Sequence, residues 1–250
     1  MRIDVLTLFP EMFLSPLQES ILKRAQQDGY LTIFLHQLRD YAFDRHQMTD
    51  DTPYGGGAGM VMKPEPVFRA VETLQQGAEA PAPVVLLTPQ GKTFDQRMAQ
   101  RLAQESRLLF ICGHYEGFDE RIREHLVTEE ISIGDYVLTG GELAAMVVID
   151  AVARWVPGVL GGTESAQRDS YAMGLLEGAT YTRPATFRDW EVPPVLRSGD
   201  HAAVDQWRRE QALKRTWERR PEIVEDAELS QEDQAYLRTL QDLEEATGNV

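Results

Sequence analysis

Two apolar runs decide the fold of this chain, Val84-Val85-Leu86-Leu87-Thr88 and Leu108-Leu109-Phe110-Ile111-Cys112. Each is short, continuous and apolar, which is typical of a strand that is buried on both faces of a parallel sheet. The segment between them, Asp95–Gln104, has a helical pattern. A strand, a helix and a second strand in this order predict an α/β fold with a mostly parallel sheet.

The same alternation continues outward in both directions. Further strands are expected at Arg2–Leu8, Leu31–Leu38 and Glu130–Ile133, and further helices between Pro10 and Asp28 and at Pro64–Gln76, Arg121–Leu126 and Glu142–Val156. Residues 40–60 are polar and rich in glycine, so we expect a long loop there. The helix at Glu142–Val156 is apolar nearly all round, which predicts burial on more than one side, in a core or in a subunit contact.

The character of the sequence changes after residue 157. Residues 1–157 form the predicted α/β domain. Residues 158–167 contain three glycines and are predicted to be a flexible interdomain linker. Residues 168–250 are charged and helical by pattern, and we expect a smaller, all-helical C-terminal domain there.

Composition excludes several classes of protein. With 250 residues, 42% of them apolar and 26% charged, the chain has the profile of a soluble globular protein. A single cysteine, Cys112, excludes an intrachain disulfide and indicates a reducing cytoplasm. The start, Met1–Asp4, lacks the apolar run of a signal peptide, and Leu143–Val156 is too short to span a bilayer. We therefore expect a cytoplasmic protein with no membrane partner.

The charge is unevenly distributed. The formal net charge of −15 by itself argues against a nucleic-acid partner. However, residues 221–250 hold nine acids and one base, whereas Trp207–Arg220 holds six bases, two acids and two tryptophans. A local basic and aromatic surface can bind RNA on an acidic protein, because charges are screened within about 8 Å. A non-catalytic RNA-binding protein is therefore one interpretation of the chain.

Three strand ends open into loops of unusual composition: Thr88–Gly91, Gly113–Arg121 and Ser132–Glu142. Ligands of open α/β sheets bind at the carboxyl ends of strands, so the three loops can converge on one site. The third loop has three glycines, which let the backbone approach a ligand closely. It matches neither the dinucleotide fingerprint nor the phosphate-binding loop. We therefore expect a less common way of holding a nucleotide-like cofactor.

Several other residues have both a structural and a functional interpretation. His114, Glu116 and Asp119 suggest a metal site, but no second histidine lies at ligand spacing, so solvated loop residues are favoured. Tyr54–Met60, with four glycines, is either a mobile linker or a backbone surface for a base or phosphate. Arg154 suits the C-terminal dipole of a helix as well as a functional role.

Asp169 has the same two interpretations on local sequence. It follows the glycine-bearing linker in the stretch Gln167–Tyr171. It can serve as a helix N-cap or a solvated acid, or it can be a functional carboxylate. Cys112, at the end of an apolar strand, is expected to be a small core residue rather than a nucleophile.

These segments together resemble the bacterial tRNA (guanine-N1)-methyltransferases, a family of the SPOUT class that uses S-adenosyl-L-methionine. The matching motifs follow one another over nearly the whole chain: Leu6–Phe13, Tyr54–Met60, Cys112–Glu120, Ile133–Glu142, Tyr181–Pro184, Ser198–His201 and Trp207–Pro221. In place of the Pro-His that often precedes Tyr-Thr-Arg-Pro in the family, this chain has Ala179-Thr180. A SPOUT enzyme acting on another RNA nucleotide is disfavoured by the residues around Asp169 and by the long C-terminal part.

The resemblance implies a fold that topology rules alone would not predict. Connections in α/β sheets are normally unknotted, whereas the family has a deep trefoil knot in which the second and third loops thread through one another. The resemblance also implies a homodimer in which the partner's C-terminal part completes each active site. A magnesium ion is implied for catalysis, although the sequence shows no ligand set for it.

The resemblance also assigns roles to residues. S-Adenosyl-L-methionine would be held by Pro89, Gly91, Gly113, Tyr115, Glu116, Ile133, Gly134, Asp135, Tyr136, Val137, Leu138, Gly140 and Gly141. The tRNA would contact Tyr54, Gly55, Gly57, Gly59, Met60, Arg183, Arg208, Arg209, Lys214 and Arg215. Asp169 would be the general base for N1 of the guanosine immediately 3′ of the anticodon, and Arg154 would stabilise charge on O6.

Overall fold

A computed structural model describes residues 1–77, 80–161, 166–167 and 169–247. Their contacts divide the chain into two compact units, Met1–Thr163 and Glu164–Val250, which we call the N-terminal and C-terminal units. The linker predicted at 158–167 falls partly on residues 162–165, which lie outside the described residues. Residue 168, the expected start of the C-terminal domain, and residues 248–250 lie outside them too.

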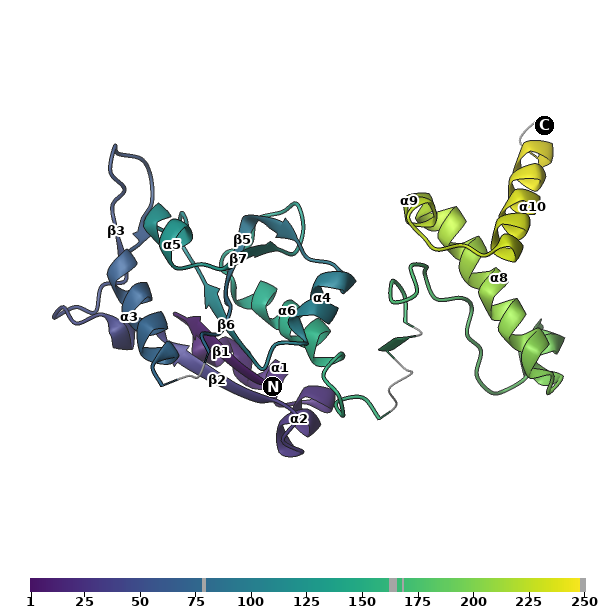
Figure 1. Cartoon of the computed structure of the whole chain (residues 1–250), viewed down its shortest axis with the longest axis horizontal. Coiled ribbons are helices and arrows are strands. Elements are labelled where there is room, and N and C mark those ends of the chain that lie inside the picture. Colours follow the sequence, from purple (N-terminus) through teal and green to yellow (C-terminus); the bar gives the residue numbers. More distant parts are fainter. Residues whose placement is uncertain (78–79, 162–165, 168, 248–250) are drawn as a thin grey trace. The chain divides into compact units, whose positions relative to one another are not determined.

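The N-terminal unit is built on a five-stranded parallel sheet, as predicted from its apolar runs (Figure 1). Its strands, in sheet order, are β2 (Thr32–Gln37), β1 (Arg2–Thr7), β6 (Arg107–Cys112), β5 (Val84–Thr93) and β7 (Glu129–Ser132). All the pairs are parallel, and the crossover from β2 to β5 puts β6 between β1 and β5. The parallel pairing brings the carboxyl ends of β5, β6 and β7 to one edge of the sheet.

Helices cover both faces of this sheet, and alternate residues of each strand face the two sides. One face packs against α3 (Pro64–Gln75), α5 (Glu120–His125) and the 3₁₀ helix η2 (Leu38–Tyr41). The other packs against η1 (Pro10–Phe13), α1 (Leu14–Leu17), α2 (Ser20–Gln27), α4 (Gln96–Leu102) and α6 (Glu142–Ala153). The predicted long loop at 40–60 contains the short strand β3 (Asp50–Asp51), which pairs with β4 (Val61–Met62).

Strand β5 differs from its prediction in a way that shapes the site. It continues to Thr93, because its pairing with β7 jumps from Leu87 to Lys92 opposite Ile131. Residues 88–91 form the excursion between these two pairs. A side chain on Gly91 would place its Cβ 2.5 Å from the backbone nitrogen of Ile131. Glycine therefore allows the strand to return onto β7 after the excursion.

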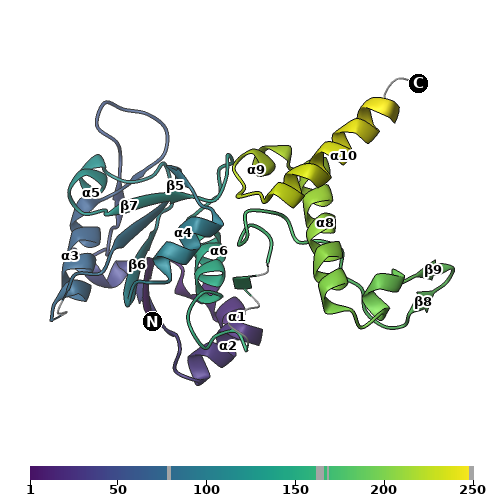
Figure 2. The same cartoon turned by 45° about the vertical axis from the view of Figure 1, so that its right-hand side comes forward.

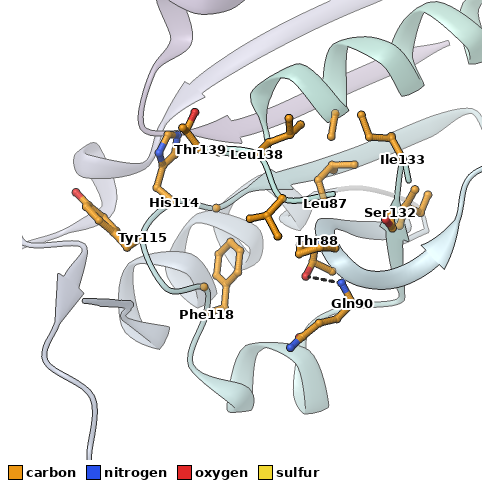
Figure 3. A pocket seen from close by; sticks show the side chains of 18 of the residues that line it. Leu87, Thr88, Gln90, His114, Tyr115, Phe118, Ser132, Ile133, Leu138 and Thr139 are labelled. Carbon is orange, nitrogen blue, oxygen red and sulfur yellow. Dashed lines mark hydrogen bonds between the residues drawn. The ribbon is translucent and has the colours of Figure 1, made fainter. Parts of the chain in front are cut away.

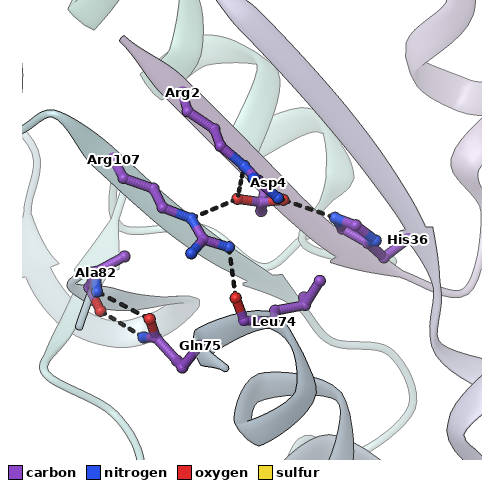
Figure 4. Close-up of polar contacts among 7 residues, drawn as sticks. All are labelled: Arg2, Asp4, His36, Leu74, Gln75, Ala82 and Arg107. Carbon is purple, nitrogen blue, oxygen red and sulfur yellow. Dashed lines mark hydrogen bonds and ion pairs between the residues drawn. The ribbon is translucent and has the colours of Figure 1, made fainter. Parts of the chain in front are cut away.

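A polar cluster lies within the sheet beneath α3 (Figure 4). Asp4 is fully buried on β1, and its carboxylate accepts hydrogen bonds from Arg2 (2.8 and 2.9 Å) and Arg107 (2.8 Å) and contacts His36 (2.8 Å). Arg107 also donates to the carbonyl oxygen of Leu74 at the end of α3 (2.8 Å). Burial alone would disfavour the carboxylate, so these partners are what keep it charged.

The C-terminal unit is mainly helical. It contains η3 (Pro194–Arg197), α8 (His201–Arg219), α9 (Pro221–Glu225) and α10 (Gln231–Thr247). Leu175 and residues of the last three helices form its core: Ala212, Leu213, Val224 and Leu237. The expectation of an all-helical domain is wrong in one respect. Strands β8 (Thr186–Phe187) and β9 (Trp190–Glu191) form a short antiparallel hairpin (Figure 2). No helix in the described part of the chain is long and apolar enough to cross a membrane.

Candidate cofactor-binding and catalytic site

A pocket opens at the sheet edge where β5, β6 and β7 end (Figure 3). It encloses about 230 Å³, many times the space that a single water needs, and therefore suits an organic ligand. The excursion of β5 and the loops after β6 and β7 all contribute to its wall. The lining residues are Leu87–Gln90, Gly113–Phe118, Arg123, Ile131–Ile133, Tyr136–Gly141 and Ala144. The three loops predicted to converge on one site thus line one pocket.

Glycines let the loops come together at this pocket. The amide of Gly141 donates to the carbonyl oxygen of Gly113 (2.9 Å), which ties the third loop to the second. A Cβ on Gly141 would lie 2.8 Å from the Cα of Cys112. A Cβ on Gly113 would overlap the ring of Phe118, and one on Gly140 would overlap His114. A side chain at Gly140 or Gly141 would therefore push the third loop away from the second, and one at Gly113 would displace Phe118 within the second loop.

A buried polar network anchors the second loop to the rest of the N-terminal unit. Glu142, the first residue of α6, is 1% exposed and accepts a hydrogen bond from the hydroxyl of Thr7 (2.6 Å). Its other carboxylate oxygen lies 2.8 Å from Nε2 of His114. The His114 ring packs edge-on against Phe9, with centroids 4.7 Å apart. The network therefore joins the end of β1, the second loop and the start of α6.

Cys112 lies beside this network, and its thiol is expected to be unreactive. Burial, and secondarily the nearby charge of Glu142, raises the pKa of its thiol well above the ordinary value. The thiolate is the reactive form, so this thiol is a poor nucleophile. The prediction of a core residue is confirmed by its burial within the strand β6.

The glycine-rich segment Tyr54–Met60 docks onto the second loop. The amide of Glu116 donates to the carbonyl oxygen of Met60 (2.9 Å), and that of Met62 donates to Gly117 (2.8 Å). A Cβ on Gly59 would lie 2.5 Å from the side chain of Glu116. The Tyr54 side chain is fully exposed at the start of the segment. The structure thus brings the segment predicted to contact RNA next to a loop predicted to hold a cofactor.

Comparison with known proteins identifies the family. The model of the family "tRNA (Guanine-1)-methyltransferase TrmD" matches residues 1–226. The chain belongs to this family. It is 60% identical to a tRNA (guanine-N(1)-)-methyltransferase of Dehalococcoides mccartyi over 95% of the chain and 96% of the relative. It is 58% identical to that of Moorella thermoacetica, covering 96% of each chain, and 57% identical to that of Anoxybacillus flavithermus, covering 95% and 97%.

Most residues that the resemblance to the TrmD family assigned to the cofactor line the pocket. They are Pro89, Gly113, Tyr115, Glu116, Ile133, Tyr136, Val137, Leu138, Gly140 and Gly141. Three of the assigned residues are not among the lining residues. Gly91 packs against β7, Gly134 takes a turn with a φ of +150°, and the side chain of Asp135 is exposed.

The residue-by-residue assignment to the cofactor left out several lining residues. Thr88, Phe118 and Thr139 belong to the three predicted loops, whereas Arg123 lies outside them. The hydroxyl of Thr88 accepts from the amide of Gln90 (3.4 Å), as Figure 3 shows, and from Arg123 (3.2 Å). Arg123 also pairs with Glu130. Arg123 lies in the last turn of α5, the helix that follows the second loop, and no local sequence signal marks it as a lining residue.

Polar side chains of the second loop contact other protein side chains. His114 is bonded to Glu142, and Asp119 accepts two hydrogen bonds from the Arg121 guanidinium (2.7 Å each). Within the described ranges, no group of three or more His, Cys, Asp or Glu side chains could hold a metal ion. The favoured interpretation of solvated loop residues describes the exposed Glu116, whereas His114 and Asp119 are partly buried and have protein partners.

The two residues assigned to catalysis lie in different units. Arg154 is the C-cap of α6 and is partly buried. Asp169 is also partly buried, and it begins a segment that is anchored on α8. In that segment the amide of Leu176 donates to the hydroxyl of Thr216 (2.9 Å), and Arg215 donates to the carbonyl oxygens of Glu177 (2.9 Å) and Gly178 (2.8 Å). Arg215 thus fixes the segment that carries Asp169.

The remaining residues assigned to tRNA have varied surroundings. Arg209 forms a bidentate pair with Asp233 (2.9 and 3.0 Å), which joins α8 to α10. Weaker, exposed pairs link Arg208 to Asp205 (3.4 Å) and Lys214 to Glu218 (3.8 Å). Arg183 and the glycines Gly55 and Gly57 are exposed. Contact with tRNA stays a prediction for all of these residues.

Proposed function

We propose that this protein transfers a methyl group from S-adenosyl-L-methionine to N1 of the guanosine immediately 3′ of the tRNA anticodon. The observation that carries the proposal is the pocket built by three loops at the ends of β5, β6 and β7. Its glycine cradle and apolar walls suit a flat heterocycle. Membership of the TrmD family narrows the reaction to methylation of a tRNA guanine.

The described residues fit the cofactor. Ile133, Tyr136 and Leu138 would pack on its adenine, and Gly140 and Gly141 would let the backbone approach closely. When bound, S-adenosyl-L-methionine supplies a methyl group already activated on a sulfonium. The protein's own task is therefore to align the guanine and make N1 a better nucleophile.

Two side chains would carry out that task. Guanine N1 holds a proton and is a poor nucleophile until the proton leaves. Asp169 would accept it, a general-base role that is worth about 10²–10⁴-fold in rate. The guanidinium of Arg154 would stabilise the negative charge that develops on O6. Support comes from the resemblance to the family and from the chemical types of the two residues.

The proposal includes no step through magnesium. The described part of the chain offers no cluster of acidic or histidine side chains for a cation. The assigned acids Glu116 and Asp169 belong to different units. We therefore derive the proton transfer from the protein side chains alone.

A trefoil knot and a homodimer are part of the proposal. The backbone bond between Gly141 and Gly113 supports close interlocking of the second and third loops. The helix α6 supports the dimer, because Leu143 and Val147, one turn apart, are 50% and 49% exposed. The helix α6 was predicted to be buried on more than one side. That prediction requires another surface to cover Leu143 and Val147, and a second copy of the chain would supply one.

Mixing two impaired variants, assayed at a cofactor concentration well below the raised Kd of Gly141→Ala, tests whether the active site is shared. Asp169→Asn keeps the pocket, and Gly141→Ala keeps Asp169. If Asp169 acts on the partner's pocket, mixed dimers contain one complete site, and random exchange restores about a quarter of wild-type activity. If Asp169 acts within its own subunit, mixing restores nothing and the shared site is refuted.

The main test is methylation of unmodified tRNA transcripts with labelled cofactor, followed by mapping of the modified base. Label on N1 of the guanosine 3′ of the anticodon is expected, and a transcript with adenosine there should accept none. Label at another nucleotide would refute the assigned position. Calorimetry with S-adenosyl-L-methionine separates the enzyme from a non-catalytic RNA-binding protein, because a pure RNA binder should give no heat with the cofactor.

The segment Tyr54–Met60 is predicted to recognise the target guanosine or its neighbouring guanosine. Equal methylation of transcripts with and without that neighbouring guanosine would refute this role.

A further inference from the structure

The β8–β9 hairpin exposes two aromatic side chains with a guanidinium between them. Phe187 and Trp190 are cross-strand partners, 57% and 66% exposed, with ring centroids 6.2 Å apart. The Arg188 guanidinium carbon lies 5.3 Å from the Phe187 ring and 5.9 Å from the Trp190 ring. We call these three side chains the hairpin platform. None of them belongs to the core cluster of the C-terminal unit.

The charge of the platform is uncompensated. Among the residues that the structure describes, no carboxylate lies within 4.0 Å of the Arg188 guanidinium. Glu191 is adjacent to Trp190 in β9, and successive side chains of a strand point to opposite faces. By contrast, Arg209 and Arg220 of the same unit are each paired with an acid. The guanidinium is instead held by two aromatic rings, a contact that leaves its N–H groups available.

Exposed rings and an unpaired guanidinium match the chemistry of a single-stranded nucleotide. Aromatic side chains stack on unpaired bases, and arginine binds the adjacent phosphate. Bases within an A-form helix are already stacked and cannot reach such a surface. A protein partner would bury the Arg188 charge and would need to supply an acid in compensation. An RNA loop supplies both a π-face and a phosphate.

We infer that the hairpin platform binds an unpaired nucleotide of the tRNA, with the base on Phe187 and Trp190 and the phosphate on Arg188. The inference rests on the proposed function, because it takes tRNA as the substrate. It adds a contact outside the pocket and outside the basic helix α8. Stacking is tolerant of base identity, so the platform would strengthen binding without selecting one base.

Filter binding of the full-length protein to an unmodified tRNA transcript tests the inference. Trp190→Leu removes the ring and should raise the Kd for the transcript roughly 5- to 150-fold, the loss expected for one stacked base. Trp190→Phe keeps a ring and should stay within about threefold. Thr186→Ala, on the same hairpin but outside the platform, is the matched control and should bind as the wild type does.

Arg188 is tested separately through salt dependence. Arg188→Gln should lower the slope of log Kd against log salt by about 0.7–0.9, the value for one phosphate contact. Arg188→Lys keeps the charge and should keep the slope. An unchanged Kd for Trp190→Leu, or an unchanged slope for Arg188→Gln, would overturn the inference.

The outcomes separate this inference from the proposed function. Wild-type protein that methylates the transcript while Trp190→Leu binds it normally would refute the platform alone. Wild-type protein that methylates no guanine would refute the function. A change of sedimentation coefficient in Trp190→Leu without RNA would show that the platform is a contact between copies of the chain, which also overturns the inference. Unchanged circular dichroism would confirm that the variants are folded.

Discussion

The two units differ in the kind of binding surface that they present. In the N-terminal unit the acids Asp4 and Glu142 are buried and fully partnered, and the loops close around one small pocket. The C-terminal unit has a small core and exposes Tyr181, Phe187 and Trp190. The N-terminal unit is thus preorganised for a small ligand, whereas the C-terminal unit offers open surface to a large one.

The difference between the units would lose its meaning for catalysis if the N-terminal unit alone carried out the reaction. Asp169 belongs to the C-terminal unit, yet we expect Asp169→Asn to lower kcat about 10²–10⁴-fold because a general base is lost. The Kd of the cofactor, measured by calorimetry, should not change. Asp226→Asn, an exposed acid in the same unit, should keep normal turnover. Comparable turnover by Asp169→Asn would remove the C-terminal unit from the chemistry.

Asp4 tests the claim that buried acids hold the N-terminal unit together. Asp4→Asn leaves the Arg107 side chain, which is 14% exposed, without its carboxylate. We expect the free energy of unfolding in urea to fall by about 3–5 kcal/mol, the usual cost of breaking a buried pair. Glu129→Gln breaks the exposed pair with Arg101 and should cost at most about 1 kcal/mol.

The pH dependence of stability gives a second measure of Asp4. Burial alone would raise its pKa, but hydrogen bonds from His36, Arg2 and Arg107 lower it well below the ordinary value. A lowered pKa in the folded state stabilises the protein above the unfolded-state pKa of about 3.9. That stabilisation is lost as the pH falls below this value. Below pH ~4, the free energy of unfolding should therefore fall more steeply for the wild type than for Asp4→Asn. The same pH dependence in both proteins would contradict this account.

Much of the N-terminal unit could be predicted from sequence, because apolar runs and glycine-bearing strand ends are local signals. The convergence of the three loops followed from the parallel sheet. The excursion of β5 could not be predicted, since it depends on the pairing of Lys92 with Ile131, far apart in the chain. The buried pair of Glu142 with Thr7 joins residues that are still farther apart in the chain. The β8–β9 hairpin was missed because each strand has only two residues.

Preorganisation of the pocket is tested by adding one methyl group. Gly141→Ala would place a Cβ against the backbone of Cys112, and overpacking of this kind costs about 1–3 kcal/mol. If the cost falls on the bound form, the Kd of S-adenosyl-L-methionine rises roughly 5- to 150-fold. Gly161→Ala meets nothing within 4 Å and is the matched control. Normal cofactor affinity in Gly141→Ala would mean that the pocket adapts to its ligand.

Thr216 tests whether the C-terminal unit, despite its open surface, is rigid where it carries Asp169. Its buried hydroxyl donates to Ala212 (2.6 Å) and accepts from the amide of Leu176 (2.9 Å). Thr216→Val leaves that amide unpaired, at a cost of about 1–3 kcal/mol. Because the segment from Asp169 to Leu176 loosens, kcat should fall more than the affinity for the cofactor. Thr239→Val removes an exposed hydroxyl whose bond is confined to its own helix, and it should change neither quantity. A stability loss in Thr216→Val with normal kcat would mean that RNA binding, rather than the fold of the unit, positions Asp169.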